Sequence, residues 1–254
     1  MLLVPVLLAA ASLRIVSLAP ALTEDLFAIG AGPQVVATDV FSNRPAAARR
    51  LPHVGGMRDV DAEAVLTHRP GLVVGVPYEA AQLADVRRAG LRTVALPLDD
   101  LGDDLRAIRT LGALTGHRVA AARLVAAIRA RLGAAHARAA RGRRLRVFVS
   151  LGSMGTAGGG SYVDDLLGLA NLDNVAHDVH RPWLTYAAEQ LVAAQPDVVV
   201  LPVPGPPLVG EPWAHLDAVR AGRIVRIPQD DLLRPGPRVA DVLDDLVAGV
   251  ARWR

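Results

Sequence analysis

Two stretches of the chain share one order of polar and apolar positions, at residues 61–74 and 187–200. In each stretch a glutamate, Glu63 or Glu189, stands seven residues before a proline. A short amphipathic segment separates the glutamate from the proline, and a run of β-branched and other apolar residues follows. The repetition predicts two related structural halves in one chain.

Each copy predicts a helix followed by a buried strand. The helix ends at its proline, because the residue before a proline is disfavoured in the α region. The apolar runs at 72–76 and 198–201 are typical of parallel strands covered on both faces. A second matched pair, at 89–97 and 221–228, predicts a further strand in each half.

Strands and helices alternate through the N-terminal half. We expect strands at 13–18, 34–38 and 91–96, and helices near 21–29, 79–88 and 101–114. A further strand at 145–151 and a closing helix at 237–253 are expected in the C-terminal half. This alternation predicts an α/β fold with parallel sheets.

A long helix is expected between the halves, at 117–140. Its apolar stripe comprises Ala121, Leu124, Val125, Ile128, Leu132 and Ala135. About 24 residues of helix would extend for roughly 36 Å, which is enough to connect two lobes. The predicted organisation is a lobe at 13–116, a bridging helix at 117–142 and a second lobe at 143–254.

The first 12 residues are uncharged and mostly apolar. A helix of that length is too short for a bilayer, which needs about 20 residues. The segment resembles the apolar core and cleavage site of a secretory signal, although it has no basic start. We expect an exported, periplasmic or otherwise extracytoplasmic protein, with a buried N-terminal strand as the alternative.

Composition excludes several function classes. Hydrophobic residues make up 52% of the chain and charged residues 21%, which excludes a disordered protein. All 28 basic residues are arginine, and they are dispersed among acids, so no nucleic-acid partner is expected. The chain has no cysteine, which excludes disulfides, thiol nucleophiles and lipid attachment to a cysteine.

The sequence motifs give little evidence for an enzyme. The glycine-rich loop at 152–161 follows a strand, but a P-loop requires a lysine and the chain has none. We interpret the loop as a flexible wall of a ligand site. His177 and His180 could ligate a metal, yet no third ligand stands at a typical spacing, so no metal site or cofactor is predicted.

Glu63 and Glu189 are expected in the first turns of their helices, where a carboxylate is stabilised by unpaired N–H groups. Helix capping would explain one copy alone. In two related lobes the pair would form matched exposed acids, which a partner with two basic pockets could recognise.

The order of short motifs from Leu13 to the end resembles one family of transport proteins. The motifs are Ile15–Glu24, Pro45, Gly55–Met57, Ala62–Glu63, Arg69–Pro70, Arg181–Trp183, Glu189–Leu191, Pro196–Val198 and Pro237–Arg238. Together they are similar to the cobalamin, haem and ferric-siderophore class of ABC-importer substrate-binding proteins. Within that class the vitamin B12-binding proteins of cobalamin importers are the nearest kin.

The resemblance implies a fold and a set of site residues. The fold is that of class III periplasmic binding proteins, in which two Rossmann-like lobes are bridged by one long helix and ligand binds between the lobes. The family's permease-docking glutamates correspond to Glu63 and Glu189. The implied ligand contacts are Phe41, Ser42, Tyr78, Trp183, Asp230, Asp231, Leu232, Leu233 and Arg234. The implied partners are a small-molecule ligand and an ABC permease dimer, with the protein a monomer and not an enzyme.

Departures from the family pattern leave the ligand open. Two tryptophans that line the cobalamin site fall on Val54 and Val76, and an aromatic residue falls on Asp231. A cobalamin-like ligand is expected, with haem or a ferric siderophore as alternatives. Haem ligation could use Tyr78, Tyr162 or His180, and a siderophore could use Arg58, Arg181 or Arg234. A metal-binding importer subunit and a cytoplasmic α/β enzyme remain the rival classes.

Overall fold

The structure is a computed structural model that describes residues 13–56 and 59–254. The segment 1–12, which was interpreted as a signal, and Met57 and Arg58 lie outside the described residues. The described chain divides into two compact units. The N-terminal unit comprises the described part of Met1–Leu96 with Leu111–Arg118, and the C-terminal unit comprises Pro97–Thr110 with Val119–Arg254.

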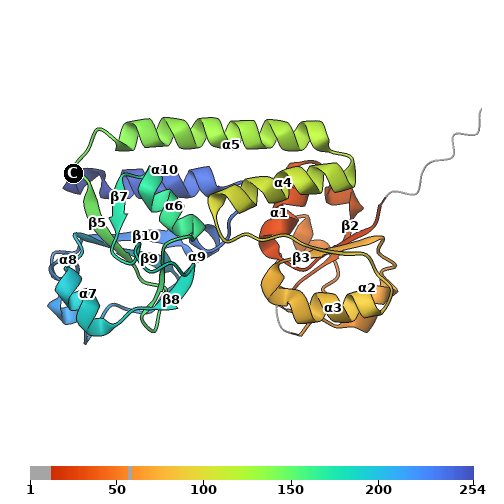
Figure 1. The fold of residues 1–254 in the computed structure, drawn as a ribbon, viewed down its shortest axis with the longest axis horizontal. Helices are drawn as coiled ribbons and strands as arrows, with labels where there is room; N and C mark the ends of the chain where they lie inside the picture. The colour runs from red at the N-terminus through yellow and green to blue at the C-terminus, as the bar shows by residue number, and fades with distance from the viewer. Residues whose placement is uncertain (1–12, 57–58) are drawn as a thin grey trace, which may run out of the picture. The chain divides into compact units, whose positions relative to one another are not determined.

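A four-stranded parallel sheet forms the N-terminal unit, in the order β2-β1-β3-β4. Its strands are β1 (Ile15–Ser17), β2 (Val35–Thr38), β3 (Leu72–Gly75) and β4 (Thr93–Ala95). Figure 1 shows α1 on one face of this sheet and α2 and α3 on the other. These helices are α1 (Pro20–Ala28), α2 (Ala62–Thr67) and α3 (Ala80–Arg88). Because both faces are covered, every residue of β1 and β3 is buried, and all of them except the polar Ser17 are apolar.

The C-terminal unit contains a second parallel sheet, in the order β10-β9-β5-β7. Its strands are β5 (Leu145–Val149), β7 (Leu172–Asn174), β9 (Val198–Val203) and β10 (Ile224–Pro228). Figure 1 shows α6 and α10 above this sheet and α7 and α8 below it. The helices are α6 (Tyr162–Leu169), α7 (Ala188–Ala194), α8 (Asp217–Arg220), α9 (Gln229–Leu232) and α10 (Val239–Val250).

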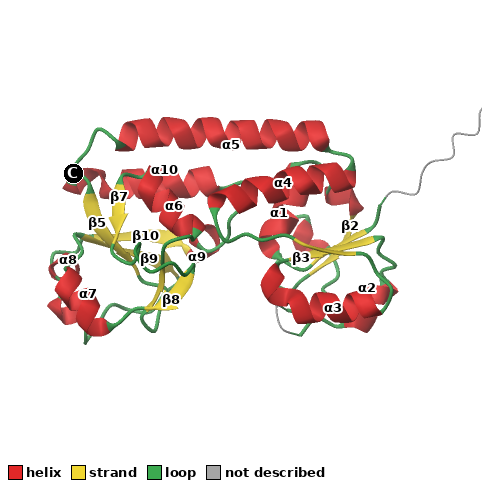
Figure 2. Cartoon of the chain, viewed as in Figure 1, coloured by secondary structure: helices red, strands yellow, loops and turns green. Residues whose placement is uncertain are grey.

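A small antiparallel sheet and several short helical turns complete the described chain. The sheet pairs β6 (Gly155–Ala157) with β8 (Trp183–Thr185). Figure 2 labels β8 among the yellow strands. The 3-10 turns are Gly32–Gln34, Ala48–Arg50, Pro77–Glu79, Trp213–His215 and Ala251–Trp253.

The predicted duplication is confirmed in the topology. Strands β2, β1, β3 and β4 occupy the same sheet order as β7, β5, β9 and β10. After both repeated helices, the residue directly before the proline has a positive φ: Arg69 (φ 45) and Gln195 (φ 40). The residue before each proline therefore avoids the right-handed helical region, as expected, and it adopts the left-handed region instead. The predicted α/β fold with two parallel sheets is confirmed.

Two longer helices follow β4. Helix α4 (Leu101–Thr115) contributes residues to both units, and α5 (Arg118–Ala139) is the predicted long helix. Its buried stripe is Ala121, Val125, Ile128, Leu132, Ala135 and Ala139. Leu124, predicted in this stripe, is only half-buried. Arg131 pairs with Asp241 (2.7 Å) and Asp244 (2.8 Å), which connects α5 to α10. The lobe boundaries at residues 116 and 142 stay a prediction.

Candidate functional site

The carboxyl edge of each sheet is the place where a fold of this kind binds ligand. In each unit the chain runs from the central strand, β1 or β5, to the neighbour on one side, β2 or β7. It then crosses to the neighbour on the other side, β3 or β9. Such a switch of direction leaves a crevice outside the carboxyl ends of the strands. The side chains that follow β1, β2 and β3, and those that follow β5 and β9, are therefore the first candidates.

Two aromatic side chains stand at this edge of the N-terminal unit. Phe41 follows β2 and is 47% exposed, and Tyr78 follows β3 and is 65% exposed. An exposed aromatic ring is costly in water unless a partner covers it, so both suit a ligand surface. Val54 and Val76, where the family carries tryptophans, are instead buried in the unit.

Ser42 belongs to a buried network of hydroxyl groups beneath Phe41. The Thr23 hydroxyl lies 2.8 Å from the hydroxyls of both Ser17 and Ser42. The Ser42 hydroxyl donates to Asp39, which also accepts from the backbone N–H of Phe41 (3.2 Å). Ser42 is 1% exposed and shares Asp39 with the Phe41 backbone; its predicted contact with ligand stays a prediction.

Glu79 is a buried carboxyl group at the same edge that the sequence analysis did not single out. Its Oε2 accepts from the Val76 backbone N–H at 3.0 Å. Burial raises the pKa of Glu79 to about 7; the bond from Val76 opposes this shift and the charge of Asp39 adds to it. No local sequence signal indicates this burial, because it depends on the assembled sheet.

Trp183 lies on β8 in the C-terminal unit and is 45% exposed. Its ring meets that of Tyr162 edge to face, with centroids 5.8 Å apart. Tyr162 is itself buried, and its hydroxyl donates to the carbonyl of Leu232 at 2.5 Å. The aromatic pair therefore connects Trp183 to the α9 segment, in which the sequence placed other ligand contacts.

The α9 segment is held by ion pairs with the residues that follow it. Asp230 pairs with Arg234 at 2.8 Å, and Asp231 pairs with Arg238. Leu232 is fully buried, whereas Leu233 is half-buried. Arg234 is thus charge-compensated within its own segment.

Asp164, Asn174 and His177 form a polar cluster beside α6. Asn174 donates to Asp164 Oδ1 (2.8 Å), and His177 Nδ1 lies 2.9 Å from Asp164 Oδ2. The bond with Asp164 raises the pKa of His177. Across residues 13–56 and 59–254, no group of three or more His, Asp or Glu side chains converges as a metal site would require.

Glu63 and Glu189 occupy the same place in the two repeated helices. Each lies in the first turn, of α2 or α7, and each is exposed. Asp61 caps α2 by accepting from the N–H of Glu63 (2.9 Å), whereas Ala187 before α7 offers no side-chain cap. Because Asp61 supplies the cap in one copy, capping does not explain why Glu63 itself is an acid.

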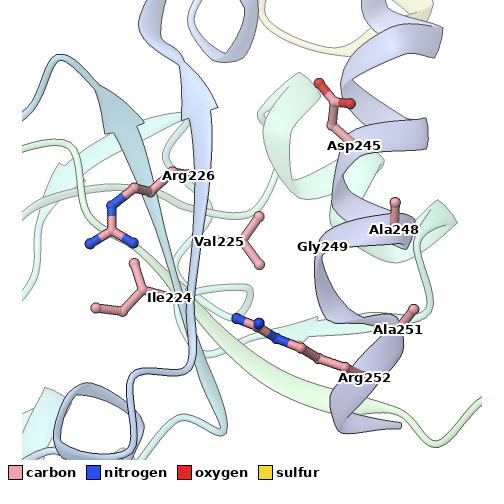
Figure 3. Close-up of a pocket in the computed structure, with 8 residues that line it drawn as sticks. All are labelled: Ile224, Val225, Arg226, Asp245, Ala248, Gly249, Ala251 and Arg252. Atoms are coloured by element: carbon pink, nitrogen blue, oxygen red, sulfur yellow. The ribbon is translucent and has the colours of Figure 1, made fainter.

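A hollow of about 520 Å³ lies elsewhere in the C-terminal unit, between β10 and the end of α10 (Figure 3). It is lined by Ile224, Val225 and Arg226 of the strand and by Asp245, Ala248, Gly249, Ala251 and Arg252. Because it includes the first residues of β10, it is distant from the carboxyl edge. None of the predicted ligand contacts lines it.

No described helix has both the length and the apolar character needed to cross a bilayer. Phe41 and Tyr78 both lie at the carboxyl edge of one unit, after β2 and β3, and Trp183, Tyr162 and α9 are connected in the other unit. The described site is therefore a pair of aromatic surfaces, one in each unit.

Known proteins share both the sequence and the fold. The profile of the periplasmic binding protein family matches residues 15–204. The vitamin B12-binding protein of Yersinia pestis is 27% identical over 200 residues, which cover 76% of this chain and 70% of the relative. The corresponding protein of Pectobacterium atrosepticum is 28% identical, with coverages of 74% and 71%.

Solved structures give the same result. The periplasmic vitamin B12-binding protein BtuF of Vibrio cholerae superposes with a TM-score of 0.82 at 25% identity, covering 94% of this chain and 96% of that one. The periplasmic haem-binding protein RhuT of Roseiflexus sp. RS-1 superposes with a TM-score of 0.79 at 29% identity, with coverages of 94% and 97%. The chain therefore belongs to the periplasmic binding protein family, in the ABC-importer class that includes vitamin B12, haem and siderophore binders.

Proposed function

We propose that this protein is the extracytoplasmic substrate-binding component of an ABC importer and that it binds a cobalamin-like ligand. The exposed aromatic residues at the carboxyl edges carry the proposal. Phe41, Tyr78 and Trp183 offer flat apolar surface, which suits a large planar ring system. The names of the relatives from Yersinia pestis and Vibrio cholerae support a corrinoid.

Each proposed contact has a role that its surroundings support. Phe41, Tyr78, Trp183 and Leu233 would contact the ligand through their side chains, and Ser42 would hold the Phe41 turn. Asp230, Asp231, Leu232 and Arg234 would contribute a segment made rigid by its ion pairs. A rigid segment loses less conformational entropy on binding.

Haem is the second candidate ligand. The relationship to RhuT, named as a haem-binding protein, supports it. Of the tyrosines considered as axial ligands, Tyr162 is buried with its hydroxyl on Leu232, whereas Tyr78 is exposed. Tyr78 would therefore be the iron ligand.

We also propose that Glu63 and Glu189 dock the protein, as a monomer, on two arginine-lined pockets of a permease dimer. The carboxylates are exposed at equivalent positions of duplicated helices. A two-fold related permease would present the same pocket twice, so a duplicated acid matches it.

The test of the ligand is a titration of the purified protein with cyanocobalamin, haemin and a ferric hydroxamate siderophore. Quenching of tryptophan fluorescence and the visible spectrum report binding, and Trp183 is the exposed tryptophan expected to respond. Saturable binding of cyanocobalamin alone would support the corrinoid. A haem spectrum that changes in Tyr78→Phe would replace it with haem, and binding of none of the three would refute the proposal.

A further inference from the structure

Two buried carboxyl groups lie on opposite sides of the carboxyl end of β1. Asp39 directly follows β2, and its backbone N–H donates to the Ser17 carbonyl of β1 at 3.0 Å. Glu79 follows β3, which pairs with β1 on its other side. Both side chains are 0% exposed. The two acids are therefore close in space although 40 residues separate them in sequence.

Each acid holds a turn that carries an exposed aromatic residue. Asp39 Oδ2 accepts from the N–H of Phe41 at 3.2 Å. The Val76–Glu79 turn, which contains Tyr78, is closed twice at 3.0 Å: Val76 N–H donates to Glu79 Oε2, and Glu79 N–H donates to the Val76 carbonyl. The acids thus determine the backbone positions of both proposed ligand contacts in this unit.

The space for Glu79 comes from a glycine. A Cβ atom on Gly75 would lie 2.6 Å from Glu79 Oε2, so only glycine lets the carboxyl group fold back over the strand end. In the second copy the matching positions, 126 residues on, are Leu201 and Gly205. There β9 continues to Val203, so no acid closes a turn at that place.

The negative charge of Asp39 raises the pKa of Glu79. The hydroxyls of Ser17, Thr23 and Ser42 around Asp39 are neutral. Other titratable or charged groups on the surrounding elements include Glu24 and the buried Asp25 on α1, His53 beside β2, Glu63 on α2, Arg92 before β4, and Asp85, Arg87 and Arg88 on α3. Asp85 is exposed and paired with Arg88.

We propose that Asp39 and Glu79 are positioning residues for the Phe41 and Tyr78 turns, and that ligand affinity falls when Glu79 becomes ionised. The proposal rests on the proposed function, because the ligand contacts of Phe41 and Tyr78 are assigned there. Burial keeps Glu79 protonated below about pH 7. When Glu79 ionises it repels Asp39 across β1, and the two turns are displaced relative to each other.

The experiment measures the dissociation constant of the ligand found by titration, or of cyanocobalamin first, between about pH 5.5 and about pH 8.5. Wild type is compared with Glu79→Gln, Asp39→Asn and the matched control Asp85→Asn, an exposed acid of the same region. We expect wild type and control to lose roughly threefold to tenfold in affinity across this range, and Glu79→Gln to lose less than about twofold. Equal pH dependence in wild type and Glu79→Gln would overturn the proposal.

A readout without ligand separates this proposal from the proposed function. Amide hydrogen exchange of Val76 should accelerate by about tenfold or more in Glu79→Ala but not in Asp85→Ala, and the Glu79 side-chain carbon should titrate near pH 7 by NMR. In Asp39→Asn this titration should move to lower pH. Unchanged exchange, or titration near the ordinary value, would overturn the positioning role even if ligand binds. Failure of every ligand to bind would refute the proposed function and the claim on affinity, while the exchange rates would still decide the positioning role.

Discussion

Arg14 and Arg146 make the same contact in the two units. Arg14 donates through Nε (3.0 Å) and Nη2 (2.8 Å) to the carbonyl of His68, at the end of α2. Arg146 donates through Nη1 (2.5 Å) to the carbonyl of Ala194, at the end of α7. Arg14 directly precedes β1, and Arg146 lies near the start of β5. Each arginine binds a carbonyl at the end of a helix that has no partner within the helix.

This contact holds the ends of the two helices that carry Glu63 and Glu189, the glutamates proposed to dock on the permease. Glu63 and Glu189 each lie at the first turn of a helix whose last turn is bound by the equivalent arginine. Each exposed acid therefore has the same position relative to its own sheet.

The double variant Glu63→Ala, Glu189→Ala should stop transport without affecting ligand binding. Both side chains are exposed and lie on helices rather than at the strand ends. We expect uptake by permease-containing vesicles to fall by roughly tenfold or more, as expected for lost charge pairs at an interface, while the dissociation constant of the ligand stays the same. The double variant Asp85→Ala, Glu211→Ala, also at exposed acids, is the control. A loss of ligand affinity in the first variant would contradict the docking role.

Phe41→Ala and Trp183→Ala should each weaken ligand binding. Removing an aromatic ring that becomes covered on binding costs about 1–3 kcal/mol, or roughly fivefold to 150-fold in affinity. Titration calorimetry measures this change. Val209→Ala, which truncates an exposed apolar side chain outside the proposed contacts, serves as the control. If the control weakens binding as much as the two aromatic variants do, the aromatic contacts are wrongly assigned.

Stability should fall as the pH rises from about 4.5 to about 7. Burial raises the pKa of Glu79 from 4.5 and that of Asp104 from 3.8, each to about 7. The folded state therefore binds more protons than the unfolded state between these values. The contribution is complete below the unfolded pKa and is lost as the pH passes the folded pKa.

Urea unfolding across this pH range measures the effect. Glu79→Gln should remove the part of this stability loss that comes from Glu79, which is at most about 3 kcal/mol in the free energy of unfolding. Asp85→Asn, at an exposed site, should keep the slope of wild type. If Glu79→Gln also keeps that slope, Glu79 titrates at its ordinary pKa in the folded protein.

Asp244→Ala should loosen the attachment of α5 to α10. Asp244 pairs with Arg131 (2.8 Å) and with Arg138, and its side chain is about one third exposed. Pairs this accessible contribute about 1 kcal/mol or less. The free energy of unfolding should therefore fall by about that amount in low salt, and the difference should shrink in about 1 M NaCl. A loss several times larger, unaffected by salt, would mean that packing rather than charge is lost.

Much of the fold was predictable because the duplicated pattern is local. The helices at α2 and α7 and the strands that follow them were predicted from a glutamate, a proline and an apolar run. The exposure of Glu63 and Glu189 followed from the same pattern. The left-handed residues Arg69 and Gln195 were not predicted, because proline excludes one backbone region without selecting among the others.

The candidate site was only partly predictable. Phe41, Tyr78 and Trp183 were selected through the resemblance, and their exposure agrees with a contact role. Ser42 and Leu232 were selected in the same way and are both buried, and their part in the ligand site stays a prediction. A resemblance aligns positions along a chain, but it does not say which side of a turn faces solvent.

The sequence by itself determined the two related halves, the parallel strands and the pair of exposed acids, because helix ends, apolar runs and prolines act over a few residues. Only the tertiary structure decided that Asp39 and Glu79 lie on either side of β1. Strand order brings residues from separate segments to one sheet edge, and burial there changes the proton affinity of a carboxyl group. Neither effect is encoded in the residues next to Glu79, so its chemistry depends on the assembled sheet.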